Sequence, residues 1–220
     1  MSYLLRVVVP DQPGMLGALA TALGRAGGDI ISVDIVERGR GVAVDDLVID
    51  LPPGRLPDGL VTAATSVSGV RVESIRPYVG GPLDTHRELE VIEAMAERPT
   101  EAMTSLVGAL PRIFRAGWAV AVRRSEDRYE VEAGSSAAPE LDGIRLPWLP
   151  LAKAHVLDPE DDWVPASWQH LGTELAAAPL GEPERAVLVG RPGGPAFRVG
   201  EVVRLAHLTG VAATILADLT

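Results

Sequence analysis

Two aspartates near the N-terminus have surroundings that suit the binding of a small charged molecule. Asp11 lies in Val9-Pro10-Asp11-Gln12-Pro13-Gly14-Met15-Leu16, and Asp29 follows in Gly27-Gly28-Asp29-Ile30. A strand that turns through Asp-x-Pro-Gly into a helix leaves the first helical amides unpaired, which favours a carboxylate there. If the fold brings Asp11 and Asp29 together, they supply the anionic partners of an α-ammonium. The pattern therefore predicts recognition of a free amino acid. The alternative is that Asp11 caps the helix and Asp29 caps a turn.

The elements that position these aspartates alternate in the order of a ferredoxin-like domain. A strand at residues 3–9 precedes a helix that starts at Pro13, a residue that suits the first helical position. Ile31, Val33 and Ile35 recur at every second position in another strand, and residues 38–41 form a hairpin turn into a third. A helix at 57–66 and a strand at 70–75 complete the order β-α-β-β-α-β. The apolar phase shifts at Asp45-Asp46, which predicts a bulge in the third strand.

A connector rich in proline and glycine, residues 77–82, separates this segment from the rest of the chain. The charge balance also changes there, because residues 1–80 carry 7 basic and 9 acidic groups whereas residues 81–220 carry 13 and 21. We therefore expect one domain over residues 1–78, a linker over 79–84 and a second domain over 85–220.

The second domain is also expected to be α+β. Helical spacing covers residues 89–96 and 103–110, and residues 118–122 pair with 129–133 in a hairpin. Residues 135–184 are rich in proline and are expected to be mostly loop, with short elements; they hold Trp148, Trp163 and Trp168. A strand at 185–190 and a helix at 199–208 follow, with a closing strand or a helix extension at 211–216.

Composition excludes several classes of function. The chain has 30 acidic against 20 basic residues, so it lacks the basic surface that nucleic-acid binding requires. It has no cysteine, which rules out disulfides, thiolate metal sites and cysteine nucleophiles. The histidines lack the paired spacing of a zinc site, and no serine lies in a Gly-x-Ser-x-Gly motif. We expect no metal, cofactor or catalytic residue. Without a long apolar run or a signal-peptide pattern, we expect no membrane span and a cytoplasmic location.

With its Asp-x-Pro-Gly turn and its Gly-x-Asp-Ile start to the second strand, the segment over residues 1 to about 78 resembles an ACT domain. The resemblance implies a domain that dimerises and binds an amino acid between copies, mostly to regulate an enzyme or a transcription factor. It implies a ligand site lined by Val9, Asp11, Gln12, Pro13, Gly14, Met15, Leu16, Asp29 and Ile30. Val9 stands where serine-binding members carry a histidine, so the ligand need not be serine.

The second domain resembles a GAF domain in its two leading helices, its hairpin, the apolar run at residues 186–189, and Phe197 before an apolar helix. The resemblance implies a small-molecule pocket under the loop-rich middle, at about residues 146–180. Trp148, Trp163 and Trp168 are candidates for its lining; packing in the core or in a lid is the alternative. No cysteine is present to attach a bilin, and the motif of cyclic-nucleotide binders is missing.

Together these features predict a non-catalytic sensor that forms a homodimer, in which the first domain binds a free amino acid and a protein partner reads the signal. An alternative is that the GAF-like domain is the main small-molecule-binding or catalytic module, and that the first domain only dimerises or controls it. In the catalytic version, Asp158, Asp161, Asp162 and His170 are the residues to test first. A third hypothesis is a scaffold that only dimerises.

Overall fold

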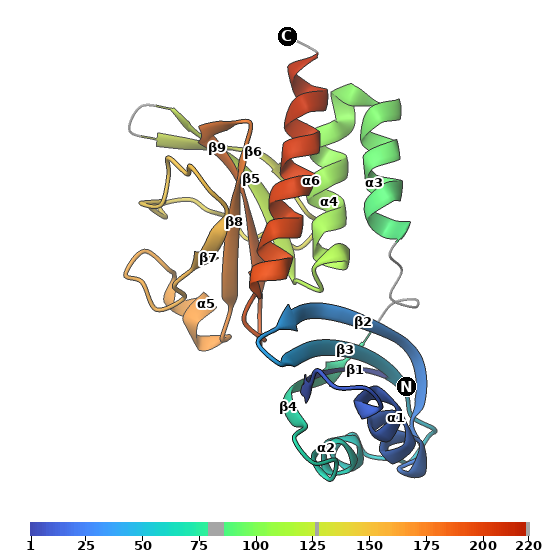
Figure 1. The fold of residues 1–220 in the computed structure, drawn as a ribbon. Coiled ribbons are helices and arrows are strands. Elements are labelled where there is room, and N and C mark those ends of the chain that lie inside the picture. The colour runs from blue at the N-terminus through green and yellow to red at the C-terminus, as the bar shows by residue number, and fades with distance from the viewer. Residues whose placement is uncertain (79–85, 126–127, 219–220) are drawn as a thin grey trace. The chain divides into compact units, whose positions relative to one another are not determined.

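The computed structural model of the chain describes residues 1–78, 86–125 and 128–218 (Figure 1). It divides into two compact units, Met1–Asp84 and Thr85–Thr220, which we call the first and the second domain. Both combine helices with one antiparallel sheet, so the class is α+β. The expected linker, residues 79–84, lies outside the described residues.

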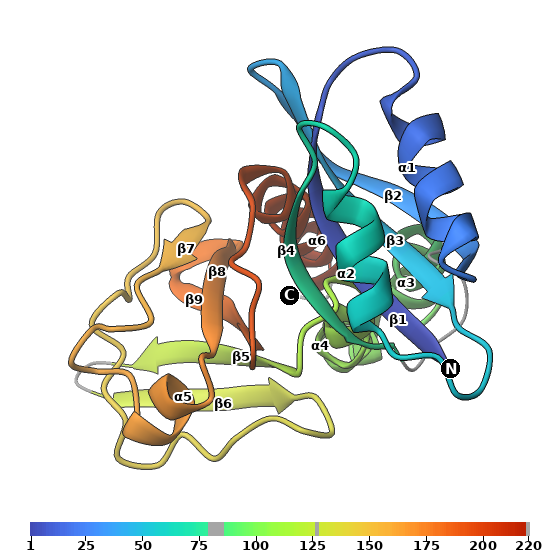
Figure 2. The ribbon, with the colours of Figure 1, turned by 90° about the horizontal axis from the view of Figure 1, so that it is seen from below.

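The first domain has the predicted order β-α-β-β-α-β. Its sheet has four antiparallel strands in the order β2-β3-β1-β4, so β2 and β4 form the edges. Both helices lie on the same face of this sheet (Figures 1 and 2). The elements are β1 (Ser2–Pro10), α1 (Met15–Arg25), β2 (Asp29–Gly39), β3 (Val42–Asp50), α2 (Asp58–Thr65) and β4 (Arg71–Pro77).

The core of the first domain lies between the sheet and the two helices. Leu5, Val7 and Val9 alternate along β1 and are buried in this core. They pack with Leu19 of α1 and Leu60 of α2, both of which are fully buried. The period of two in β1 and the helical spacing in α1 and α2 thus place these five apolar side chains in one layer. This core fixes the ends of the strands and the turns between them.

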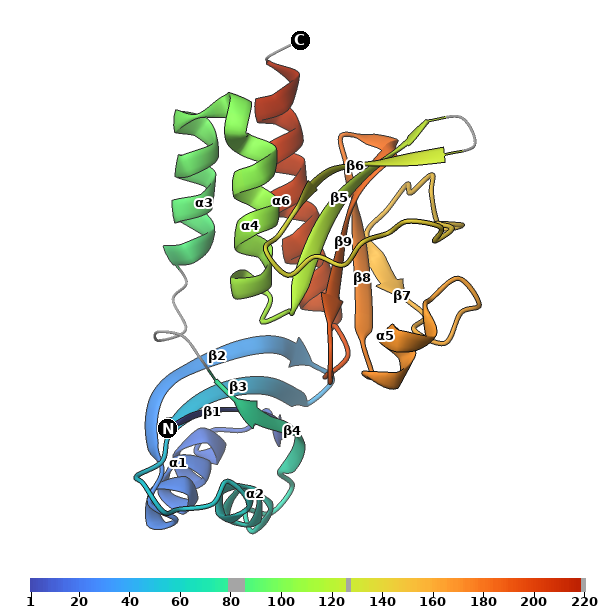
Figure 3. The same cartoon turned by 180° about the vertical axis from the view of Figure 1, so that it is seen from behind.

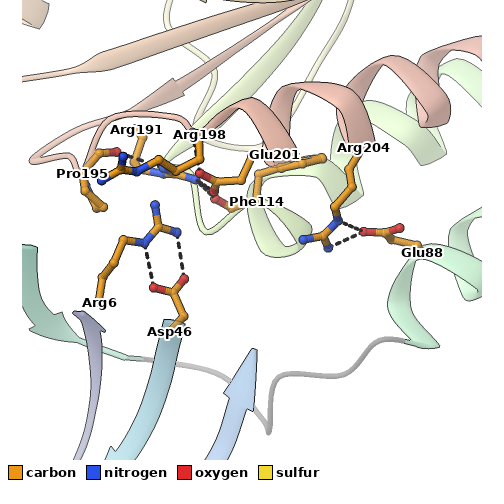
Figure 4. A network of polar contacts seen from close by, with 9 residues as sticks. All are labelled: Arg6, Asp46, Glu88, Phe114, Arg191, Pro195, Arg198, Glu201 and Arg204. Carbon is orange, nitrogen blue, oxygen red and sulfur yellow. Dashed lines mark hydrogen bonds and ion pairs between the residues drawn. The ribbon is translucent and has the colours of Figure 1, made fainter. Parts of the chain in front are cut away.

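The bulge predicted at Asp45-Asp46 of β3 is wrong. β3 pairs with β1 without a register shift from Val42 to Asp50, and the shifts opposite it lie in β2, at Ile30/Ser32 and Ile35/Glu37. The apolar phase of β3 breaks because both of its faces carry apolar residues, and because the adjacent Asp45 and Asp46 in the middle of the strand lie on opposite faces. Asp46 pairs with Arg6 on the helix-free face at 2.7 and 2.8 Å (Figure 4), whereas Asp45 lies on the helix-bearing face.

The second domain has a five-stranded antiparallel sheet in the order β6-β5-β9-β8-β7. Helices α3, α4 and α6 cover one face, and α5 and long loops lie on the other (Figure 3). The elements are α3 (His86–Glu97), a 3-10 helix (Pro99–Glu101), α4 (Ala102–Ile113), β5 (Trp118–Ser125), β6 (Arg128–Gly134), β7 (His155–Leu157), α5 (Ala166–His170), β8 (Glu174–Leu180), β9 (Glu182–Arg191) and α6 (Val199–Ala217). The turn residues Glu126 and Asp127 lie outside the described residues.

Strand β8 lies within the segment that was expected to be mostly loop. Its sequence, Glu-Leu-Ala-Ala-Ala-Pro-Leu, is rich in alanine and contains a proline, both uncommon in strands. The strand is buried next to β9, and its residues Ala176 and Ala178 belong to the core cluster that includes Leu205 and Leu208 of α6. Small side chains allow the helix to approach the sheet closely here, so tertiary packing overrides the weak local preference.

A buried ionic network joins the end of β9 to the start of α6 (Figure 4). The Arg191 guanidinium donates to the carbonyls of Phe114 and Pro195, forms an ion pair with Glu201 at 2.5 Å, and lies over the Phe197 ring at 3.9 Å. Glu201 also accepts a hydrogen bond from the backbone N–H of Arg198. The network closes the loop that contains Phe197, the residue singled out in the sequence.

By length and composition alone, α6 is the one helix among the described residues that could cross a membrane. A core helix of a globular domain passes the same test. Leu205, Leu208 and Ala212 of α6 are buried in the core cluster between the sheet and the helices. Residues 211–216 continue α6, so of the two alternatives for that segment the helix extension is correct.

Candidate functional site

The turn between β1 and α1 brings Asp11 close to the β2–β3 hairpin. Asp11 follows the last residue of β1, and its backbone N–H donates to the carbonyl of Gly41 at 2.9 Å. Gly14 is the N-cap of α1, with a φ of 89° that favours glycine, and α1 has no side-chain cap. The start of α1 follows an exposed turn made by Gln12, Pro13 and Gly14; the Met15 amide donates to the Gln12 carbonyl at 3.3 Å, and the next amides of the first turn precede the helical hydrogen bonds.

The Asp11 carboxylate is engaged by a cation of its own chain. The Arg38 guanidinium binds it through two contacts of 2.8 Å, one to each carboxylate oxygen. The hydrogen bond from Arg38 is the main reason that the pKa of Asp11 lies below its ordinary value. Asp11 thus neither caps α1 nor offers a free carboxylate. Its contacts tie the β1–α1 turn to the hairpin.

Asp45 is a candidate site residue that the sequence did not reveal. It lies in β3 opposite Val7 of β1 and Ile35 of β2, and only 4% of it is exposed. Its Oδ1 atom is buried and has no hydrogen-bond partner in the described part of the chain. Burial raises the pKa of Asp45, and the nearby charges of Asp46, Asp11 and Asp34 raise it further, against a smaller lowering by the charge of Arg38. A buried, unpartnered carboxyl group of this kind is costly unless a cation reaches it.

Asp29 lies at the opposite end of the sheet from Asp11. It pairs with Asp50 of β3, which in turn pairs with Ser2 at the start of β1. Asp11 follows the far end of β1, at a separation of about 26 Å for a strand of this length. A strand-helix-strand crossover returns the chain to the starting end of the sheet, so one copy cannot place both aspartates in one site. Within one copy, the expected convergence of Asp11 and Asp29 is therefore not found.

The remaining predicted residues divide between the core and the exposed turn. Val9 is buried in the core, Met15 and Ile30 are half-buried against it, and Leu16 is 41% exposed. The one sequence signal for Asp45 as a site residue is the shift in the alternation of apolar residues at Asp45-Asp46, and that shift also predicts a bulge.

Two open cavities among the described residues of the second domain share the loop at residues 142–147 in their lining. One, of about 930 Å³, is bordered by arginines and Tyr129; the other, of about 970 Å³, includes Asp161, Asp162 and Trp163 in its lining. Trp168 instead packs on Trp118 in the core, with ring centroids 4.8 Å apart.

The other residues singled out in the second domain are placed differently. Trp148 packs beside Trp163, with ring centroids 6.1 Å apart. Asp158 accepts a hydrogen bond from the backbone of Glu160, and neither Asp158 nor His170 is among the residues that line the two cavities. In the part of the chain that the structure describes, no group of three histidine or carboxylate side chains could hold a metal ion.

Comparison with known families identifies the first domain. The sequence model of the ACT domain family matches residues 3–66. The chain therefore contains an ACT domain, a regulatory module for small ligands. The predicted α+β architecture, with this domain at the N-terminus, is confirmed. Comparison with curated protein sequences finds no match.

Solved structures with a similar fold include several GAF domains. The GAF domain from A. aeolicus in an inactive state is 10% identical with a TM-score of 0.44, and the match covers 61% of this chain and 98% of that one. The GAF domain of a phosphoenolpyruvate-protein phosphotransferase from Coxiella burnetii is 14% identical, with coverages of 60% and 94% and a TM-score of 0.45. A GAF domain/HD domain protein from Geobacter sulfurreducens is 17% identical, with coverages of 61% and 96% and a TM-score of 0.42.

Proposed function

We propose that the protein is a non-catalytic regulatory sensor whose ACT domain binds a free amino acid beside Asp45 and the first turn of α1. The observation that carries this proposal is the buried Oδ1 atom of Asp45, which has no partner among the described residues. An α-ammonium supplies both the charge and the hydrogen-bond donors that this atom lacks. The exposed amides at the start of α1 supply donors for the α-carboxylate.

Asp45 is better suited than Asp11 to hold the ammonium. Asp11 already shares its charge with Arg38 through two contacts, and a ligand would have to displace that guanidinium. Asp45 keeps a raised pKa, so a cation that pairs with it also stabilises its ionised form. In this proposal Asp11 is a positioning residue, which holds the turn and its amides against the hairpin.

A homodimer formed through β2 would complete the site. β2 is an edge strand, and its side chains Ile31, Val33 and Ile35 are 40%, 39% and 56% exposed. An unpaired edge with exposed apolar residues favours pairing with another strand. Two β2 strands paired antiparallel about their midpoint would bring Asp29 of the partner subunit to the end of the sheet where Asp11 lies. The second aspartate of the sequence motif then reaches the ligand from the other copy.

Such a site links ligand binding to the geometry of the dimer. A ligand held by residues of both copies binds best in one arrangement of the two and shifts the population toward it. A coupling of about 1–3 kcal/mol is typical of such effects. We propose that a cytoplasmic protein partner reads this change. With 30 acidic and 20 basic residues, the chain's net charge argues against a nucleic acid in that role.

A thermal-shift screen of the full chain against the twenty amino acids tests the proposal. At about 100 times the dissociation constant, mass action adds roughly 2.7 kcal/mol to stability, which raises the melting temperature measurably. We expect a shift with one or a few amino acids and none with the matching α-hydroxy acid, which lacks the ammonium. The proposal is wrong if no amino acid shifts the melting temperature, or if the hydroxy acid acts equally well.

A further inference from the structure

We propose that the second domain binds a small organic anion, a carboxylate or phosphate carried on an apolar body, in the cleft beside the end of the β5–β6 hairpin at which Arg124 pairs with Tyr129. The cleft is the cavity of about 930 Å³ between this hairpin and the loop at residues 142–149. The inference does not depend on amino-acid binding by the ACT domain.

Two hydrogen bonds hold the loop over the hairpin. Arg124 of β5 and Tyr129 of β6 are direct cross-strand partners. The Arg124 guanidinium donates to the carbonyl of Leu149 at 2.8 Å, and the Tyr129 hydroxyl donates to the carbonyl of Leu141. The loop is therefore tied to the hairpin at both of its ends. A cleft whose two walls are tied together in this way loses little conformational freedom when a ligand enters.

The cleft concentrates positive charge in an acidic domain. Residues 85–220 carry 13 basic and 20 acidic side chains, yet Arg124, Arg128 and Arg145 all line this cavity, and among the described residues Asp142 is the one acidic side chain of its lining. Arg128 and Arg145 have no ion pair or hydrogen bond with any residue that the structure describes. The neighbouring Arg123, by contrast, pairs with Glu132 at 3.0 Å. Guanidinium groups of this kind bind carboxylates and phosphates through paired hydrogen bonds.

The apolar side chains that line the cleft indicate what the uncharged part of the ligand should be. Val131, Ile144 and Leu146 line it, and Val131 is 51% exposed although it belongs to a strand. Tyr129 adds an aromatic surface whose hydroxyl is already engaged. These side chains favour an apolar body beside the charged group, so an aromatic anion should bind more tightly than a bare one.

Isothermal titration of the full chain with a matched set of probes tests this site. The probes are phenylacetate, phenyl phosphate, acetate, inorganic phosphate and the cation benzylammonium, each at concentrations up to about 1 mM. We expect binding by phenylacetate, by phenyl phosphate or by both, weaker binding by acetate and phosphate, and none by benzylammonium. Comparison of the first two probes distinguishes a carboxylate ligand from a phosphate ligand.

Two variants decide whether the binding uses this cleft. Loss of a charged hydrogen-bond partner in Arg145→Gln or Arg128→Gln should weaken binding about tenfold or more. The matched control is Arg112→Gln on α4, which is exposed and is not among the residues that line the cleft. Tryptophan fluorescence, which reports only this domain, should be unchanged in all three variants if they fold. The proposal is overturned if no anionic probe binds, if benzylammonium binds equally well, or if binding survives Arg128→Gln and Arg145→Gln combined.

Discussion

The Arg38 guanidinium binds the carboxylate of Asp11, which lies 27 positions earlier in the sequence, with one contact of 2.8 Å to each carboxylate oxygen. This ion pair joins the β1–α1 turn to the β2–β3 hairpin, and a backbone hydrogen bond from Asp11 to Gly41 reinforces it. The residue that the sequence marked as a ligand-binding carboxylate therefore has a partner of its own. Asp45, one strand away and largely buried, is the carboxylate left for a cation.

The first prediction concerns the ranking of these two aspartates. Asp45→Asn removes the charge that faces the ligand and should weaken amino-acid binding by about tenfold to hundredfold. Asp11→Asn loosens only a partly exposed ion pair and should weaken binding by no more than about tenfold. Titration calorimetry of both variants with the same amino acid measures the ranking. A larger loss in Asp11→Asn would show that Asp11 holds the ligand.

The second prediction concerns stability and pH. The raised pKa of Asp45 means that the folded state holds this proton more tightly than the unfolded chain does. The stability from this group is fully present below the ordinary aspartate pKa of about 3.9, and it is lost as the pH rises through the raised folded value. Asp45→Asn should therefore stabilise the ligand-free first domain at pH 7, by about 1 kcal/mol.

Hydrogen exchange of the β1 and β3 amides measures this change in the stability of the first domain. Tryptophan fluorescence does not report on that domain, because the four tryptophans all lie between residues 118 and 168. The gain from Asp45→Asn should disappear toward pH 3, where Asp45 is protonated in both states. A gain of equal size at both pH values would mean that charge burial is not its cause.

The third prediction concerns the β2 edge. Ile35→Glu places a charge in the middle of the proposed interface and should convert the dimer into monomers with the fold retained. Leu56→Glu is the matched control, since Leu56 is 71% exposed and lies between β3 and α2, away from β2. Light scattering after size-exclusion chromatography gives the mass of each. A monomeric wild type, or a dimer that persists in Ile35→Glu, would contradict pairing through β2.

The fourth prediction concerns the core of the second domain. Gly190 of β9 pairs directly with Trp118 of β5, and a Cβ atom added at Gly190 would lie 2.1 Å from the indole ring. Gly190→Ala must displace Trp118, which contacts Trp168, and should destabilise this domain by about 1–3 kcal/mol or more. Urea unfolding followed by tryptophan fluorescence measures the loss. An unchanged free energy of unfolding would mean that β9 or Trp118 can move enough to accommodate the added Cβ atom without cost.

Local patterns predicted the order of elements in the first domain because the apolar residues of β1, α1 and α2 each follow one period, although the phase breaks within β3. They did not predict β8, whose alanines pack in the same core as α6 although their local preference for a strand is weak. They also did not predict Asp45 as a site residue, because an aspartate buried in a strand has the same sequence signature as a shift of register. The separation of Asp29 from Asp11 depends on strand direction, which becomes apparent only once β2 is placed in the sheet.

The most direct test of the account is an equilibrium titration with the amino acid that gives the largest thermal shift, carried out side by side on three proteins. These are the wild type, Asp45→Asn, and Asp162→Asn as a matched change of carboxylate to amide in the second domain. The account predicts that the wild type and Asp162→Asn bind with the same affinity and that Asp45→Asn binds at least about tenfold more weakly. Equal affinity in Asp45→Asn, or loss of binding in Asp162→Asn alone, would contradict the account and would place the amino-acid site elsewhere.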